Sequence, residues 1–255
     1  MPCFNSEKHI SKAISSVLKQ SLKEFELLIC DDGSSDGSYK IINQYQNQDQ
    51  RIKCFRNKTS TGAANARNIC LKNAVGQYIC FLDSDDVWHD DRIEKHIDYM
   101  KKNNVLFSYS YNCIIDEDGV YKNIYYAPDQ VDRNNMRFAN FISCSTAIYD
   151  SHALGKIYQP NIKKRNDYAL WLTILNHSKK PIGICYKKVT SSYRVNTYGL
   201  SSSKKDAALY FYKCSIEYNK QPKISAMFFL CLYLIIALIK KTKPDLYNRL
   251  VTKIF

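Results

Sequence analysis

Three aspartates, Asp83, Asp85 and Asp86, follow directly on the apolar run 78–82. In an extended segment, residues two apart point to the same side, so the carboxylates of Asp83 and Asp85 would lie close together. Like charges repel each other there, and carboxylate oxygens are ligands that Mg²⁺ and Mn²⁺ prefer. The pattern predicts a divalent cation that is shared with substrate phosphates. The alternative is a solvated acidic turn in which an aspartate caps the next helix.

A second acidic pair, Asp31 and Asp32, follows the apolar run 25–30. Runs typical of strands alternate with helical patterns through the first half of the chain. The predicted strands are 25–30, 52–55 and 77–83, and the predicted helices are 39–45, 66–74 and 92–102. This alternation is typical of a doubly wound α/β sheet, in which ligands bind beyond the carboxyl ends of the strands. Both acidic loops should therefore lie at one edge of the sheet.

The second half of the chain is more mixed. The segments 105–115 and 120–126 flank the turn sequence DEDG, which predicts a hairpin. Further strands are predicted at 143–149 and 181–186, and a helix at 166–177. Asp167 lies at the start of this helix, where aspartate is a favoured capping residue.

The segment 224–239 is continuously apolar, and lysines bracket it at both ends. As a helix it would be about 24 Å long, which is short of the ~30 Å hydrocarbon core of a bilayer. Three structures remain open: a membrane span, a helix in the membrane interface with its lysines at headgroup level, and a buried core helix. A basic tail with Lys243, Arg249 and Lys253 follows.

Composition limits the partners of the chain. With 45% hydrophobic and 24% charged residues in 255, the chain is globular, and its net charge of +13 favours anionic partners. The lysines are scattered, without the dense basic block of a nucleic-acid-binding protein. Ten cysteines include no CxxC pair, which predicts reduced, buried thiols in a cytosolic protein and no zinc site. No apolar signal-peptide core follows Met1.

Five motifs occur in one order along the chain. They are MPCFNSEKHISKAISSVLKQSLKEFELLICDDGSSDGS, GAANARN, FLDSDD, RNDYALWL and YRVNTYGLSSSK. Over residues 1–205 the chain resembles the family 2 glycosyltransferases of the GT-A fold, of the kind that builds bacterial cell-surface polysaccharides. The resemblance implies a Rossmann-like, doubly wound mixed sheet and the transfer of a sugar from a nucleotide-diphosphate donor. The family normally has an apolar strand just before MPCFN, so the first strand is expected to be missing.

The resemblance also assigns roles to single residues. The loop that lies against the nucleotide is matched by Pro2, Cys3, Phe4 and Asn5. The other donor-binding positions, around the base, the phosphates and the ribose, are matched by Asp32, Ala64, Arg67, Asp83 and Ser84. Asp85 matches the metal ligand, and Asp167 matches the catalytic base. The family often has Glu-Asp where this chain has Asn166 and Asp167.

These assignments predict an inverting glycosyltransferase that uses Mn²⁺ or Mg²⁺. Residues 1–205 would form the catalytic domain, and residues 206–255 a helical, membrane-associating segment. The acceptor would be a saccharide, free or lipid-linked, of a growing capsule, O-antigen or lipooligosaccharide, at the cytoplasmic face of the membrane. Two alternatives remain: a non-catalytic relative that binds sugar nucleotides, and a Mg²⁺-dependent phosphatase.

Overall fold

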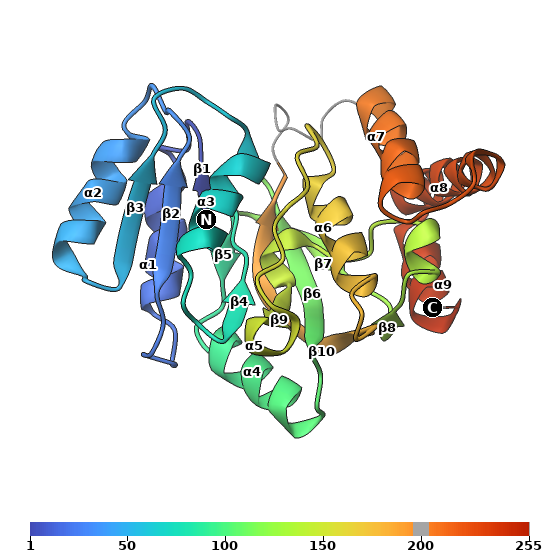
Figure 1. Cartoon of the computed structure of the whole chain (residues 1–255), viewed down its shortest axis with the longest axis horizontal. Coiled ribbons are helices and arrows are strands. Elements are labelled where there is room, and N and C mark those ends of the chain that lie inside the picture. Colours follow the sequence, from blue (N-terminus) through green and yellow to red (C-terminus); the bar gives the residue numbers. More distant parts are fainter. Residues whose placement is uncertain (196–203, 255) are drawn as a thin grey trace.

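The computed structural model describes residues 1–195 and 204–254, arranged as two β-sheets with helices packed on them (Figure 1). The first sheet is parallel and has the order β1-β2-β3, formed by Pro2–Cys3, Leu27–Asp31 and Ile52–Arg56. Both faces of β2 are buried. Leu27 and Ile29 face one cluster, whereas Leu28 and Cys30 face another. A strand covered on both faces must be apolar throughout, which explains the unbroken run.

Helices cover this sheet on both sides. Residues of α1 (Ile10–Leu18), α2 (Ser38–Gln48) and α4 (Arg92–Lys102) join the cluster around Leu27, and α3 (Ala63–Asn73) packs on Leu28. The loop after β2 needs a glycine at position 33. Gly33 has φ +78°, and a Cβ atom there would lie 2.9 Å from the backbone of Thr59.

The second sheet is mixed and has the order β4-β9-β6-β10-β5, with β7 on β6 and β8 on β10. Its strands are Tyr78–Cys80, Val87–Trp88, Phe107–Ile115, Tyr121–Tyr125, Gln130–Val131, Ile148–Asp150 and Gly183–Arg194, numbered β4 to β10 in chain order. Strands β6 and β10 are parallel, and the other pairs are antiparallel. The α/β class, the mixed sheet and the predicted hairpin (β6 and β7) are confirmed.

Three predicted strands have different bounds. The strand predicted at 77–83 is only Tyr78–Cys80, and Ser84 and Asp85 lie in a turn rather than in an extended segment. Most of 143–149 is not a strand, because Cys144–Thr146 forms a 3₁₀ turn and β9 begins only at Ile148. The other helices between β6 and β10 are the 3₁₀ helix Asn135–Arg137, α5 (Ser151–Leu154) and α6 (Asn166–Leu175). β10 continues eight residues beyond the predicted end at 186, through a register shift between Tyr186 and Val189. Exposed lysines at this irregularity hid the continuation in the sequence.

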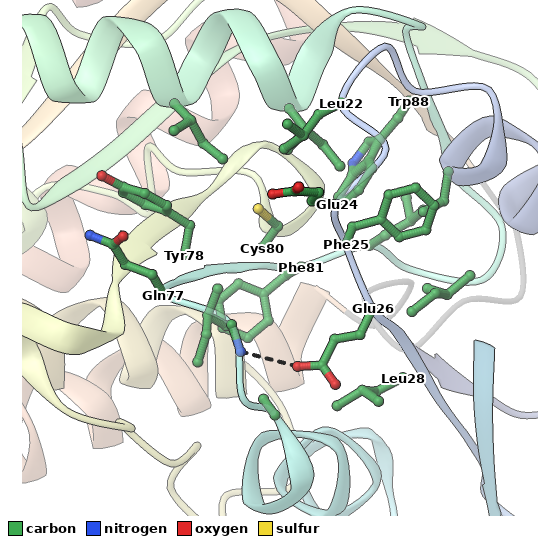
Figure 2. Close-up of a pocket in the computed structure, with 18 of the residues that line it drawn as sticks. Leu22, Glu24, Phe25, Glu26, Leu28, Gln77, Tyr78, Cys80, Phe81 and Trp88 are labelled. Atoms are coloured by element: carbon green, nitrogen blue, oxygen red, sulfur yellow. Dashed lines mark hydrogen bonds between the residues drawn. The ribbon is translucent and has the colours of Figure 1, made fainter. Parts of the chain in front are cut away.

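A cavity of about 460 Å³ is lined by residues from both β2 and β4, and we call it the interstrand cavity. Figure 2 shows its largely apolar side chains, including Leu22, Phe25, Phe81 and Trp88. β1 pairs with β2 only through Pro2 and Cys3. In the described part of the chain, β4 pairs with β9 alone.

The C-terminal segment forms α7 (Lys204–Glu217), α8 (Lys223–Thr242) and α9 (Pro244–Ile254), which pack beside α6 (Figure 1). Phe211 of α7 lies between two rings, with centroids 5.3 Å from Tyr168 and 4.3 Å from Tyr233 of α8. α8 is long and apolar enough to cross a membrane, and only 6% of its apolar window is buried. The buried-core-helix alternative is therefore wrong.

The ten cysteines form no disulfide, and Cys231 on α8 is the exposed one. Burial raises the pKa of the Cys30 thiol and of the Cys185 thiol to about 12. These thiols behave as small apolar core groups.

Candidate active site

Arg67 holds the first aspartate of the acidic turn. It projects from α3, is 6% exposed, and donates a hydrogen bond to Asp83 within an ion pair. Its other terminal nitrogen donates to Asn166 Oδ1 (3.1 Å) at the start of α6. Burial acts to lower the pKa of the Arg67 guanidinium, but the neighbouring Asp83 carboxylate outweighs this and the pKa is raised. One buried cation thus connects α3, the acidic turn and α6.

Asp86 points away from solvent and anchors the turn. It is 1% exposed and accepts hydrogen bonds from Ser145 Oγ (2.5 Å) and the Arg194 backbone nitrogen (2.9 Å). Burial raises its pKa well above the usual value, and the charges of Asp85 and Asp83 add to this. This contact explains the 3₁₀ turn at Cys144–Thr146, which presents Ser145 to the carboxylate.

Asp85 is the carboxylate with the least support from the protein. Burial raises its pKa to about 6 and Asp83 adds to the rise, while its own backbone N–H and the charges of Arg194 and Arg67 oppose it. A divalent cation beside this carboxylate would stabilise its charged form and so offset both causes, and Asp85 therefore fits the expected metal ligand. Within residues 1–195 and 204–254, no three His, Cys, Asp or Glu side chains form a ready-made metal site.

Asp167 lies in the first turn of α6, and the cap position is occupied by Arg165. The capping interpretation of Asp167 is therefore wrong. Its carboxylate accepts a hydrogen bond from Asn140 Nδ2 at 2.8 Å. Arg165 has φ +61°, which is uncommon for a residue with a side chain, and its guanidinium donates to the Tyr233 hydroxyl of α8. Asn140 carries no sequence signal, and we did not anticipate it.

Asp83, Arg67 and Asp167 line one cavity of about 350 Å³, which we call the catalytic cavity. Its remaining side chains come mainly from β6, the segment 140–144 and the loop before α6, with single residues from β7, β10, α7 and α8. They include Asn112, Tyr125, Asn140, Lys163, Lys164, Tyr193 and Lys240. The structure therefore brings together three predicted site residues that are far apart in the sequence. Ala64 is buried in α3, and its neighbour Ala63 lines the cavity instead.

The predicted nucleotide loop is tied to two neighbouring loops. Asn5 has φ +48°, and its Oδ1 accepts a hydrogen bond from the Ser35 backbone nitrogen at 2.9 Å. Ser6 Oγ lies 2.7 Å from Ser84 Oγ in the acidic turn. Pro2 and Cys3 are buried in β1, whereas the Phe4 ring is 51% exposed. The loop thus presents one aromatic face to solvent beside the acidic turn.

Asp32 organises the loop between β3 and α3. Its carboxylate accepts hydrogen bonds from the backbone nitrogens of Thr61 (2.9 Å) and Gly62 (2.8 Å), and from Asn57 Nδ2 (2.7 Å). Burial acts to raise the pKa of Asp32, but these hydrogen bonds outweigh it and the pKa is lowered. The carboxylate is therefore ionised and well satisfied within the protein. Its predicted contact with the nucleotide base stays a prediction.

The family model for glycosyl transferase family 2 matches residues 1–157. The chain belongs to this family. Among curated relatives, the chain is 39% identical over 205 residues to the UDP-Glc:alpha-D-GlcNAc-diphosphoundecaprenol beta-1,3-glucosyltransferase WfgD of Escherichia coli, covering 80% of this chain and 79% of the relative. It is 34% identical over 208 residues to the putative teichuronic acid biosynthesis glycosyltransferase TuaG of Bacillus subtilis, covering 81% and 82%.

Two solved structures show that this glycosyltransferase has the GT-A fold. TarS of S. aureus in complex with UDP-GlcNAc matches with a TM-score of 0.70 and 21% identity, covering 96% of this chain and 74% of that one. The mannosyltransferase PcManGT of Pyrobaculum calidifontis, in complex with GDP-Man and Mn²⁺, matches with a TM-score of 0.66 and 14% identity, covering 94% and 74%. The last motif of the resemblance, from Tyr193 onward, falls largely on 196–203 and so lies outside the described residues.

Proposed function

We propose that this chain is a metal-dependent, inverting glycosyltransferase that moves a sugar from a nucleotide diphosphate to a hydroxyl of a lipid-linked saccharide. The observation that carries the proposal is the catalytic cavity itself. It holds a carboxylate paired with a buried arginine, Asp83 with Arg67, and a second carboxylate, Asp167, that an amide orients. This is a site with one group to position a donor and another to accept a proton.

Asp167 is the group that removes the proton. A sugar hydroxyl is a weak nucleophile near neutral pH, and a carboxylate in contact with it takes its proton as the new bond forms. The amide of Asn140 donates to Asp167 Oδ2, which leaves the other oxygen for the acceptor. Attack from the side opposite to the leaving group inverts the anomeric carbon, and no covalent intermediate on the enzyme is needed.

The donor would lie against the loop of Pro2, Cys3, Phe4 and Asn5, with the exposed Phe4 ring available to stack on the base. Asp32 and Ala64 support the neighbouring loop and helix, and Asp83 and Ser84 would face the ribose. Arg67 holds Asp83 in place through their ion pair. Mn²⁺ or Mg²⁺ bound by Asp85 would supply positive charge next to the diphosphate leaving group.

The acceptor and the location are inferred from the relatives and from α8. The name of WfgD gives a diphosphoundecaprenol-linked sugar as its acceptor. TuaG is named as a putative glycosyltransferase of teichuronic acid biosynthesis. The exposed apolar side of α8 would lie on the inner face of the cell membrane, where such acceptors are used. We therefore place the activity in the synthesis of a cell-surface glycan.

A panel of nucleotide sugars with Mn²⁺ or Mg²⁺, scored by release of nucleoside diphosphate, tests this function. We expect turnover of at least one donor by the wild type, and its loss in EDTA and in Asp85→Asn, since an amide is a poor metal ligand. Donor binding without any turnover, over the whole panel and with GlcNAc-diphosphate lipid as acceptor, supports instead the non-catalytic relative.

A further inference from the structure

Five cations line the catalytic cavity, and they differ in how far the protein neutralises them. Arg67 pairs with Asp83, and Lys164 Nζ lies 2.6 Å from Asp206. Arg165 is held by the Tyr233 ring and hydroxyl. In the part of the chain that the structure describes, Lys163 and Lys240 have no carboxylate partner. The cavity therefore carries positive charge that the described residues do not compensate.

Aromatic rings fix the position of Lys240. Its Nζ lies 3.9 Å from the centroid of the Tyr125 ring and 5.5 Å from that of Tyr247, and the two tyrosine hydroxyls are 3.2 Å apart. Ring faces attract an ammonium group without neutralising its charge. Lys240 also continues the packed face of α8, after Tyr233 and Ile236. Helix packing thus directs this cation toward the cavity.

A polar group without a partner lies beside it. Asn112 of β6 is opposite Tyr125 in the β6–β7 pair and lines the same cavity. Asn112 is 1% exposed, and its Oδ1 accepts no hydrogen bond from the described residues. A buried acceptor left in this way costs about 1–3 kcal/mol, which a hydroxyl or amide N–H of a ligand would relieve. The cavity therefore offers a sugar-binding acceptor together with Lys163 and Lys240, which have no carboxylate partner among the described residues and no ion pair to give up to a ligand.

The exposed side of α8 is apolar up to the turn that carries Lys240. Leu234, Ile235 and Leu238 are 49%, 53% and 61% exposed. The catalytic cavity thus combines a base (Asp167), a buried amide and two cations, and the helix that carries one of these cations presents an apolar surface. This combination matches an acceptor built as sugar, phosphate and lipid.

We propose that Lys163 and Lys240 bind the phosphate groups of the acceptor, while the exposed face of α8 lies along its lipid. The assignment rests on the proposed function only in that the sugar hydroxyl is taken to face Asp167. It adds the residues that recognise the anionic part of the acceptor. An anionic headgroup of the membrane presents the same phosphate chemistry, so the experiment must separate the two sources.

The probe is dodecyl diphosphate, titrated calorimetrically into the full-length protein with UDP and Mg²⁺ in excess to fill the donor site. A charge-assisted contact is worth about 1.5–3 kcal/mol, so Lys240→Gln and Lys163→Gln should each weaken binding roughly 10- to 100-fold. Lys241→Gln is the matched control, because it removes the same charge from the next residue of α8, which does not line the cavity. It should change binding less than about threefold.

Each outcome decides the proposal. Equal losses in Lys240→Gln and Lys241→Gln would mean general attraction to phosphate and would overturn it, as would unchanged binding in Lys240→Gln. Flotation with phosphatidylglycerol vesicles separates the headgroup: we expect both variants to bind vesicles alike, and a loss confined to Lys240→Gln would assign the site to the membrane. Diphosphate binding that depends on Lys240 without any donor turnover would retain this site and reject the proposed function.

Discussion

The interstrand cavity and the catalytic cavity differ in size and in the chemistry of their linings, and Arg67 lines both. The interstrand cavity is the larger, about 460 Å³ against about 350 Å³, and is walled mainly by apolar side chains. Among the described residues, the catalytic cavity contains paired charges, cations without a carboxylate partner, and a buried amide oxygen that accepts no hydrogen bond. An apolar gap costs packing energy, whereas unsatisfied polar groups cost electrostatic energy that a ligand can recover. We therefore propose that the chemistry takes place in the smaller cavity.

The most direct test of the difference between the two cavities is to neutralise one carboxylate in each. Asp167→Asn should reduce turnover about 10²–10⁴-fold and leave donor binding and melting temperature nearly unchanged, because it removes the base alone. Asp98→Asn, an exposed carboxylate that lines the interstrand cavity, is the control and should leave turnover as it is. Steady-state kinetics with equilibrium donor binding measures both.

A comparable loss of turnover in Asp167→Asn and Asp98→Asn would contradict this division of roles between the two cavities.

The variant Asn140→Ala gives a test with a smaller expected effect. It removes one hydrogen bond to Asp167, and we expect a fall in turnover of roughly tenfold with donor affinity retained.

The second prediction fills the interstrand cavity. A chain extended ahead of Met1 by an apolar strand should pair with β2 and β4, burying side chains worth about 1.5–3 kcal/mol each against an ordering cost of about 1–2 kcal/mol per residue. With a net gain of about 3 kcal/mol, the melting temperature should rise by roughly 6–12 °C. An extension of equal length with serine at the inward positions is the control. Equal melting temperatures for the two would show that the cavity does not accept a strand.

The third prediction concerns the pH dependence of stability. Burial and Asp83 raise the pKa of Asp85 to about 6, above its value near 3.9 in the unfolded chain. Between these values the native state holds more protons than the unfolded state, so stability falls as pH rises from about 4 to about 6 and stays lower above. In EDTA at pH 7.5, Asp85→Asn should therefore melt a few degrees higher than wild type, on the order of 2–4 °C.

At about pH 3 that difference should largely vanish, because the carboxyl is then mostly protonated in both states. Adding Mn²⁺ with UDP should stabilise the wild type and not the variant. Asp90→Asn, in an exposed position, serves as the control for a change of net charge. A variant no more stable than wild type at pH 7.5 would mean that the Asp85 charge is already compensated by the protein.

Local sequence patterns predicted the elements and the carboxylates but not their partners. Strand β2, helix α4 and the β6–β7 hairpin follow from apolar periodicity and turn residues that act over a few positions. The catalytic cavity instead depends on Asn112, Asn140 and Lys240, which long-range packing brings to Asp167. No short motif encodes that packing. The extension of β10 was missed for the same reason, since its lysines are placed at a bulge only by the neighbouring strand.

The exposure of Cys231 makes α8 chemically addressable without further engineering. The other thiols are buried or half-buried, and burial raises the pKa of Cys3 and of Cys54 to about 11. A thiol-reactive fluorophore at neutral pH should therefore attach first at Cys231. Its emission, and its quenching by lipids that carry a quencher at known depths, would report where this helix lies in a bilayer.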